Sequence, residues 1–80
     1  MTEHDLSLWL EQWVSAATGE AEIDPSKPLE AYGLSSRDAV ILSGELENLL
    51  GAKLDPTIAY QYPTIEALAH GLPAARETKQ

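Results

Sequence analysis

The sequence predicts an all-α fold, a small bundle of three main helices and one short helix with a long first loop. Apolar residues recur at spacings of three and four in three separate segments, the pattern of amphipathic helices. Each segment ends at a glycine or a proline. The chain has 80 residues, of which 44% are hydrophobic and none is cysteine. A core this small, without disulfides, favours a compact bundle built from local contacts.

The first helix is expected to open at Asp5 and to stop at Gly19, which suits a left-handed C-cap. His4 precedes it, in a terminus that we expect to be frayed. Trp9 and Trp13 lie one turn apart, and we interpret them as core anchors in preference to a binding site. The buried stripe of this helix is predicted to be Leu6, Trp9, Leu10, Trp13, Val14 and Ala17.

A long ordered loop is expected from Glu20 to Leu34, because two prolines and Gly33 interrupt this stretch. Loops of this length are uncommon in compact domains and are usually functional. We expect four side chains to hold the loop against the core: Ile23, Leu29, Tyr32 and Leu34.

The second helix is predicted to run from Ser36 to Leu50 and to end at Gly51. Gly44 lies in its middle, where glycine costs about 1 kcal/mol relative to alanine. Gly44 is expected on the outward side of this helix. There it would either create a flat surface patch or simply be tolerated by the fold. The inward stripe is predicted to be Ala39, Leu42, Leu46, Leu49 and Leu50, with Val40 at its margin.

Two adjacent serines at the start of this helix are predicted to differ in role. Ser35-x-x-Asp38 before an apolar run is a capping box, in which the Ser35 hydroxyl accepts the Asp38 amide and the Asp38 carboxylate reaches back. Ser36 then occupies the first helical position with its hydroxyl free and pointing outward. Because a helix N-terminus favours phosphate, this hydroxyl is a candidate attachment point.

A short third helix is predicted from Pro56 to Gln61, with Asp55 as its N-cap and Tyr62-Pro63 as its end. Thr64 is expected to cap a last helix that Gly71 and Pro73 end. Its stripe is predicted to be Ile65, Leu68, Ala69 and Leu72. Residues 1–72 thus form one predicted domain, and residues 73–80 a flexible tail or linker.

The net charge is −8, from thirteen acidic and five basic residues. This balance argues against nucleic acid and against an anionic membrane surface as partners. It favours partners with basic patches, or it serves only to keep the protein soluble. No apolar run approaches the roughly 20 residues of a membrane span, and no secretory signal is visible at the N-terminus. We therefore expect a cytoplasmic protein.

The sequence offers little for catalysis. His4 and His70 are remote in sequence from both serines, and a bundle this small has no room for a substrate cleft. Two isolated histidines without thiolates do not predict a metal site. The residues thus predict a protein that undergoes chemistry and does not perform it.

Two segments resemble one protein family. Residues 33–40, Gly-Leu-Ser-Ser-Arg-Asp-Ala-Val, are similar to the Gly-Leu/Ile-Asp-Ser-Leu-x-Ala-Val motif of acyl carrier proteins and peptidyl carrier domains. Residues 62–69, Tyr-Pro-Thr-Ile-Glu-Ala-Leu-Ala, resemble the Tyr/His-Pro-Thr-Ile-x-x-Leu-Ala segment of those domains in polyketide and peptide synthases. With the order of helices, the resemblance covers roughly residues 5 to 72.

The resemblance implies an acyl-carrier-like bundle that is not an enzyme and is expected to be monomeric. It implies that a phosphopantetheinyl transferase attaches 4'-phosphopantetheine from coenzyme A to Ser36. The terminal thiol of that arm would carry acyl groups as thioesters, so a chain without cysteine can use thiol chemistry. The arm would deliver them from an acyl-loading enzyme to a ketosynthase or another acyl-accepting enzyme.

The resemblance also implies that partner enzymes recognise the second helix. The residues expected to contribute are Ser35, Arg37, Asp38, Ile41, Glu45 and Glu47. Three positions depart from the family pattern. Ser35 replaces an aspartate, Arg37 replaces a leucine or methionine, and Gly44 stands where many carriers have a bulky residue. These departures suggest a specialised set of partners.

The variant motif of residues 33–40 is most similar to N-terminal carrier domains of mycolic-acid-type polyketide synthases, which fatty acyl-AMP ligases load. Two alternatives remain open at this point. One is a peptidyl carrier domain, since the bundle is shared and partners choose the cargo. The other is a carrier-like docking module that is never modified, which the presence of Ser36 disfavours.

Overall fold

The computed structural model describes the backbone of residues 2–78 and the side chains of residues 2–72. The predicted all-α fold is confirmed. Its elements are α1 (Glu3–Thr18), a 3₁₀ turn η1 (Leu29–Tyr32), α2 (Ser36–Leu50), α3 (Ile58–Gln61) and α4 (Ile65–Thr78). Within residues 2–78 the only β-pairing is an isolated antiparallel bridge between Pro28 and Thr64. No helix in this part of the chain is long and apolar enough to cross a membrane.

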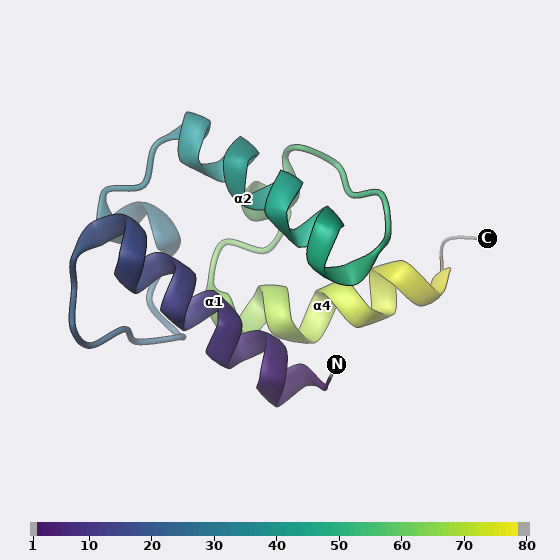
Figure 1. The fold of residues 1–80 in the computed structure, drawn as a ribbon, viewed down its shortest axis with the longest axis horizontal. Coiled ribbons are helices and arrows are strands. Elements are labelled where there is room, and N and C mark those ends of the chain that lie inside the picture. Colours follow the sequence, from purple (N-terminus) through teal and green to yellow (C-terminus); the bar gives the residue numbers. More distant parts are fainter. Residues whose placement is uncertain (1, 79–80) are drawn as a thin grey trace.

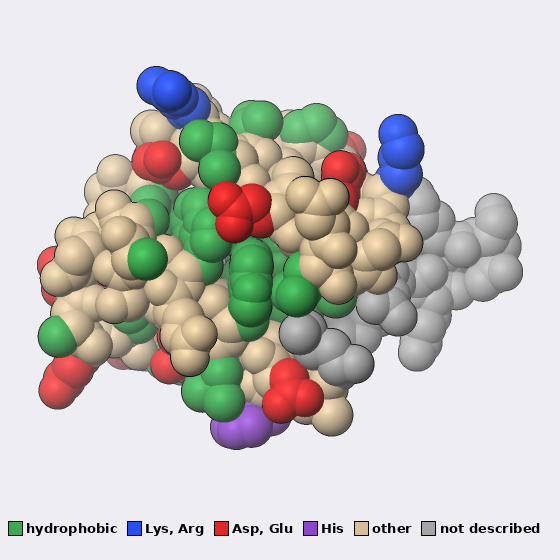
Figure 2. Space-filling view, viewed as in Figure 1, with side chains coloured by type: hydrophobic (Ala, Val, Ile, Leu, Met, Phe, Trp, Pro, Cys, Tyr) green, Lys and Arg blue, Asp and Glu red, His purple; other side chains and the backbone are tan. Residues whose placement is uncertain are grey.

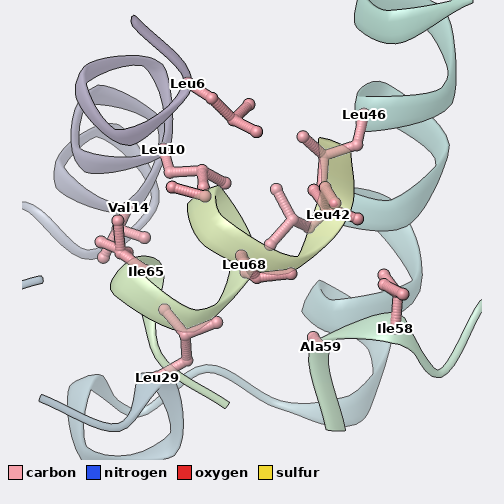
Figure 3. Close-up of a cluster of buried hydrophobic side chains, with 12 residues drawn as sticks. Leu6, Leu10, Val14, Leu29, Leu42, Leu46, Ile58, Ala59, Ile65 and Leu68 are labelled. Carbon is pink, nitrogen blue, oxygen red and sulfur yellow. The ribbon is translucent and has the colours of Figure 1, made fainter. Parts of the chain in front are cut away.

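The core lies between α1, α2 and α4, where α1 packs along α4 and α2 contacts α3 (Figure 1). Leu10 of α1, Leu46 of α2 and Leu68 of α4 are each fully buried. In Figure 3 the apolar side chains of α1 and α2 converge on α4, and η1 and α3 close the cluster from the loops. The buried members are Leu6, Leu10, Val14, Leu29, Leu42, Leu46, Ile58, Ala59, Ile65, Leu68, Ala69 and Leu72.

Helix α1 begins earlier than predicted. Thr2 is its N-cap, and Asp5 is the third helical residue, whose carboxylate completes a capping box with Thr2. His4 therefore lies in the first helical turn and is exposed, instead of in a frayed terminus. Gly19 ends the helix in the left-handed conformation, as predicted. Ala17 is exposed, so its place in the buried stripe was wrong.

The first loop is held to the start of α4 by backbone hydrogen bonds. The amide of Leu29 donates to the carbonyl of Pro63 at 2.8 Å, and the amide of Glu66 donates to the carbonyl of Pro25 at 2.9 Å. Leu29 is buried, and the other three predicted contacts (Ile23, Tyr32 and Leu34) pack half-buried against the core. The prediction of an ordered loop is confirmed, but it missed the 3₁₀ turn η1.

Helix α3 begins at Ile58, two residues after the predicted start. The Asp55 carboxylate accepts hydrogen bonds from the Thr57 amide at 2.8 Å and the Thr57 hydroxyl at 2.6 Å. These bonds form a separate turn ahead of the helix, since aspartate readily closes such turns on its own backbone. The predicted break at Tyr62-Pro63 is observed.

Helix α4 runs to Thr78, past the predicted end at Gly71 and Pro73. Thr64 caps its first turn, accepting the Ala67 amide at 3.0 Å, as predicted. Gly71 has a packing role instead of a stop role, because a side chain there would overlap the ring of Tyr62. The suggested tail or linker role of residues 73–80 stays a prediction, and their side chains lie outside the described residues.

Candidate functional site

Ser36 lies at the junction between the first loop and α2. The chain leaves η1 at Gly33, whose φ of +82° lies in the left-handed region that glycine favours. Ser35 follows in extended geometry as the N-cap, and Ser36 is the first residue of the 15-residue α2. The side chain of Ser36 is exposed. The junction thus presents this hydroxyl at the end of a rigid helix.

The neighbouring Ser35 is fully engaged in the predicted capping box. Its hydroxyl accepts the Asp38 amide at 3.3 Å, and the Asp38 carboxylate accepts the Ser35 amide at 3.0 Å and the Ser35 hydroxyl at 3.1 Å. The hydrogen bonds from Ser35, together with the nearby Arg37, hold the pKa of the Asp38 carboxyl below its usual range. Within the described residues, no hydrogen bond involves the Ser36 hydroxyl.

The described histidines lie away from α2. His4 is in the first turn of α1, and His70 of α4 lies 3.5 Å from the Glu3 carboxylate of α1. Figure 2 shows the histidine side chains at the lower edge of the molecule, opposite the upper edge where α2 runs. Residues 2–72 contain no group of three or more potential metal ligands.

Each acidic residue proposed for partner recognition has an internal hydrogen-bond partner. Asp38 binds Ser35, as described above. The Glu45 carboxylate accepts the indole Nε1–H of Trp13 at 3.2 Å, and the Glu47 carboxylate accepts the Leu54 amide at 2.8 Å. Their recognition role stays a prediction, and the structure adds a structural role to each.

The outer face of α2 beyond Ser36 is apolar. Val40 is 52% exposed and Ile41 is 43% exposed. Ile41, which was expected to contribute to partner recognition, thus lies outward, whereas the placement of Val40 at the margin of the inward stripe was wrong. Ser43 is buried instead, and its hydroxyl donates to the Val40 carbonyl at 2.7 Å. Such back-bonding lets a serine satisfy its hydroxyl inside a helix, so polarity alone did not reveal its burial.

A small apolar cavity of about 60 Å³ opens beside the start of α2. Trp13, Leu34, Ala39, Leu42 and Tyr60 contribute to its walls, and Ser35 and Asp38 lie at its polar edge. It is smaller than the roughly 150 Å³ that accommodates benzene in an engineered protein cavity. The sequence did not predict it, because its lining comes from elements far apart in the chain.

Comparison with known proteins decides the family. The family model described as "Phosphopantetheine attachment site" matches residues 9–72. The chain belongs to this family. It is therefore a phosphopantetheine carrier domain, and the cofactor of its family is covalently attached 4'-phosphopantetheine. The resemblance read from the two sequence motifs is confirmed.

Two similar curated proteins are polyketide synthases. A phenolphthiocerol/phthiocerol polyketide synthase protein of Mycobacterium tuberculosis is 46% identical over 74 residues, which are 90% of this chain and 4% of that synthase protein. Polyketide synthase PksL of Bacillus subtilis is 33% identical over 51 residues, 64% of this chain and 1% of that synthase. The carrier domain thus spans a very small part of these relatives.

Solved structures share the fold. A free-standing peptidyl carrier protein from Acinetobacter baumannii has a TM-score of 0.83 and 35% identity, covering 92% of this chain and 95% of its own. BlmI, a type-II acyl carrier protein from Streptomyces verticillus, has a TM-score of 0.81 at 18% identity, covering 91% of this chain and 88% of its own. The latter likeness concerns the fold alone.

The residues around Ser36 fit the family's cofactor. A phosphodiester on this hydroxyl would lie at the N-terminus of α2, where the free amides and the helix dipole favour a negative charge. The Asp38 amide is already bound to Ser35, so Ser36 and Arg37 provide the first-turn amides of α2 that have no intrahelical acceptor. The exposed guanidinium of Arg37 adds a cation one residue away.

Proposed function

We propose that Ser36 is the attachment point of phosphopantetheine and that the chain carries acyl groups between partner enzymes. The observation that carries this proposal is the division between the two serines. The Ser35 hydroxyl caps α2 by hydrogen bonding to Asp38. The exposed Ser36 hydroxyl has no hydrogen-bond partner among the described residues. An incoming enzyme can therefore reach Ser36 without disturbing the helix.

A phosphopantetheinyl transferase is the enzyme that this site requires. An ester bond would form between Ser36 Oγ and the pantetheine phosphate of coenzyme A, the pyrophosphate bond would break, and adenosine 3',5'-bisphosphate would leave. Because neither described histidine lies on α2, the transferase must supply the base that takes the serine proton. The attached group supplies a terminal thiol that holds the cargo as a thioester.

The proposed cargo is an acyl group, because the curated relatives at 46% identity are polyketide synthase proteins. We further propose a fatty acyl-AMP ligase as the loading enzyme, a ketosynthase or other acyl-accepting enzyme as the recipient, and the cytoplasm as the location. A flexible tether raises the effective concentration of cargo at each partner's active site.

A second candidate is a peptidyl carrier that holds an amino acid. It is supported by the 35% identity and the TM-score of 0.83 to a free-standing peptidyl carrier protein. The two candidates share the bundle and the attachment site. They differ in the enzyme that loads the arm.

Loading assays on the intact chain separate these candidates. The apo protein is first incubated with coenzyme A, magnesium and a phosphopantetheinyl transferase, and its intact mass is measured. The modified protein is then offered a fatty acyl-AMP ligase with a long-chain fatty acid and ATP, or an amino-acid adenylating enzyme with its substrate. We expect fatty acyl transfer; aminoacyl transfer alone would favour the peptidyl carrier. Failure of several transferases to modify the protein would favour the unmodified docking module.

A further inference from the structure

A groove of about 370 Å³ lies along the outer side of α1, between this helix and the loop that follows it. Leu8, Gln12 and Ser15 line it, and their spacing of four and three places them on the side of α1 opposite its buried stripe. The hydroxyl of Ser15 donates to the carbonyl of Glu20 at 2.6 Å, which holds the loop against this side. We call this feature the α1 groove, and its walls include Leu8, Glu11, Gln12, Ala16, Ala21 and Ile23.

The apolar side chains of the α1 groove are open to solvent. Leu8 is 44% exposed, Ala16 and Ala21 are exposed, and Ile23 is half-buried against the core. An α-helix rises 1.5 Å per residue, so the groove extends about 12 Å from Leu8 to Ala16, or about two helical turns. Covering such apolar surface is favourable because it releases water. The groove therefore suits two apolar side chains of a partner that lie one turn apart.

The charge around the α1 groove is negative and has no internal counterpart. The chain has six acidic residues and no lysine or arginine before Lys27, and Lys27 itself lies 4.5 Å from the ring centroid of Tyr32. Glu11 lines the groove, and Glu20 and Glu22 lie beside it in the loop. Among the described residues, neither of these loop carboxylates forms a hydrogen bond or an ion pair. Figure 2 shows acidic and apolar side chains together at the left edge, over the loop after α1.

We propose that the α1 groove binds a basic amphipathic helix of a partner protein. Two apolar side chains of that helix would fill the groove, and its lysine or arginine side chains would meet the carboxylates. A strand has no edge to extend, because the only β-pairing within residues 2–78 is one isolated bridge. A second copy of this chain, with its net charge of −8, or an anionic membrane would bring negative charge to the same carboxylates.

The α1 groove is separate from the attachment site. None of its lining residues belongs to α2, and none lines the small cavity beside the start of α2. A helix bound there leaves Ser36 free, so it can hold the carrier near one partner while other enzymes reach the arm. Such tethering raises the effective concentration of the arm at those enzymes. Binding does not require modification of Ser36, so Ser36→Ala should bind the helix as well as the wild type does.

A synthetic peptide tests the occupant and its place. The probe is a helical peptide with two leucines four residues apart on one face, flanked by lysines, and NMR of the ¹⁵N-labelled full chain locates its binding. We expect shift changes at Leu8, Ala16 and Ile23, and weaker binding as salt is added. A twin peptide with glutamate in place of lysine should not bind. Shift changes confined to α2 or α4, or equal binding of the two peptides, would overturn the proposal.

Two pairs of variants provide matched controls. Leu8 is 44% exposed and Ile41 on α2 is 43% exposed, so serine at either position removes a similar apolar group. We expect Leu8→Ser to weaken peptide binding by about fivefold or more and Ile41→Ser to stay within about twofold. Glu11→Lys should also weaken binding, whereas Glu66→Lys makes the same change of charge at an exposed position on α4 and should have a smaller effect. Circular dichroism confirms that each variant is folded. Equal effects within either pair would contradict the proposal.

Two further measurements test the other occupants. Sedimentation equilibrium of the wild type should show a monomer, and sedimentation with vesicles that contain phosphatidylserine should show no bound chain. A dimer, or vesicle binding, that Leu8→Ser abolishes would assign the α1 groove to a second copy or to a membrane, and the proposal would be wrong.

Discussion

The carboxylate of Glu45 on α2 accepts a hydrogen bond from the indole Nε1–H of Trp13 on α1 at 3.2 Å. The two residues are 32 positions apart in the chain, so this contact joins two helices that the sequence alone does not pair. Trp13 also lines the small cavity beside the start of α2. Glu45, which was predicted to recognise partners, is thus hydrogen-bonded to a side chain that lines that cavity.

Removing this contact should weaken the bundle slightly. We expect Glu45→Ala to lower the free energy of unfolding by about 0.5–1 kcal/mol, since the bond is solvent-exposed. Glu45→Gln keeps an acceptor oxygen and should lose less. Urea unfolding followed by tryptophan fluorescence measures both. Equal stability of the wild type and Glu45→Ala would show that the contact contributes nothing.

Glu47 should matter more for stability than Glu45. Its carboxylate accepts a hydrogen bond from the amide of Leu54, which lies partly buried in the segment that follows α2. Glu47→Ala leaves that amide without its acceptor, and we expect a loss of about 1–2 kcal/mol in the free energy of unfolding. Glu47→Gln is the matched control, because its side-chain oxygen can still accept. A stable Glu47→Ala variant would mean that water replaces the carboxylate.

The capping box should make stability depend on pH. Hydrogen bonds from Ser35 lower the pKa of Asp38, so the unfolded chain binds the proton more readily than the folded chain. The contribution of the Asp38 carboxylate to the free energy of unfolding is therefore complete at pH values above the usual aspartate pKa of about 4. It is lost as the pH falls through the lower pKa of the folded state. Asp24 and Asp55 are shifted in the same direction, so the comparison must isolate Asp38.

The comparison is between the wild type and Asp38→Ala. We expect the melting temperature of the variant to be lower at pH 7, and the gap between the two proteins to narrow as the pH is lowered toward 3. Differential scanning calorimetry at several pH values measures the gap. A gap that stays constant or widens in acid would contradict the role assigned to the Asp38 carboxylate.

Two helix glycines should respond oppositely to alanine. At Gly44 the added methyl group meets nothing, so Gly44→Ala should raise the free energy of unfolding by about 1 kcal/mol. At Gly71 the added Cβ would lie 2.7 Å from Cζ of Tyr62, so Gly71→Ala should lower it by about 1–3 kcal/mol. Thermal unfolding of both variants tests this, and a change of the same sign in both would contradict the packing at Tyr62.

Local signals in the sequence predicted the site well because they act over short distances. The capping box of Ser35 and Asp38 and the limits of α2 depend on residues at most four apart, and both are confirmed. The end of α4 was predicted wrongly because proline and glycine weaken a helix without forbidding it. The Glu45–Trp13 contact and the cavity depend on how helices pack, which periodicity does not specify.

The central claim is that the transferase modifies Ser36 and that Ser35 only caps α2. Intact-mass measurement after incubation with coenzyme A, magnesium and a transferase tests it most directly, on the wild type, Ser36→Ala and Ser35→Ala. Ser35→Ala should unfold more easily, by about 1 kcal/mol, yet still gain one phosphopantetheine. Ser36→Ala should remain as stable as the wild type and gain none. Modification of Ser36→Ala, with none on folded Ser35→Ala, would contradict the claim.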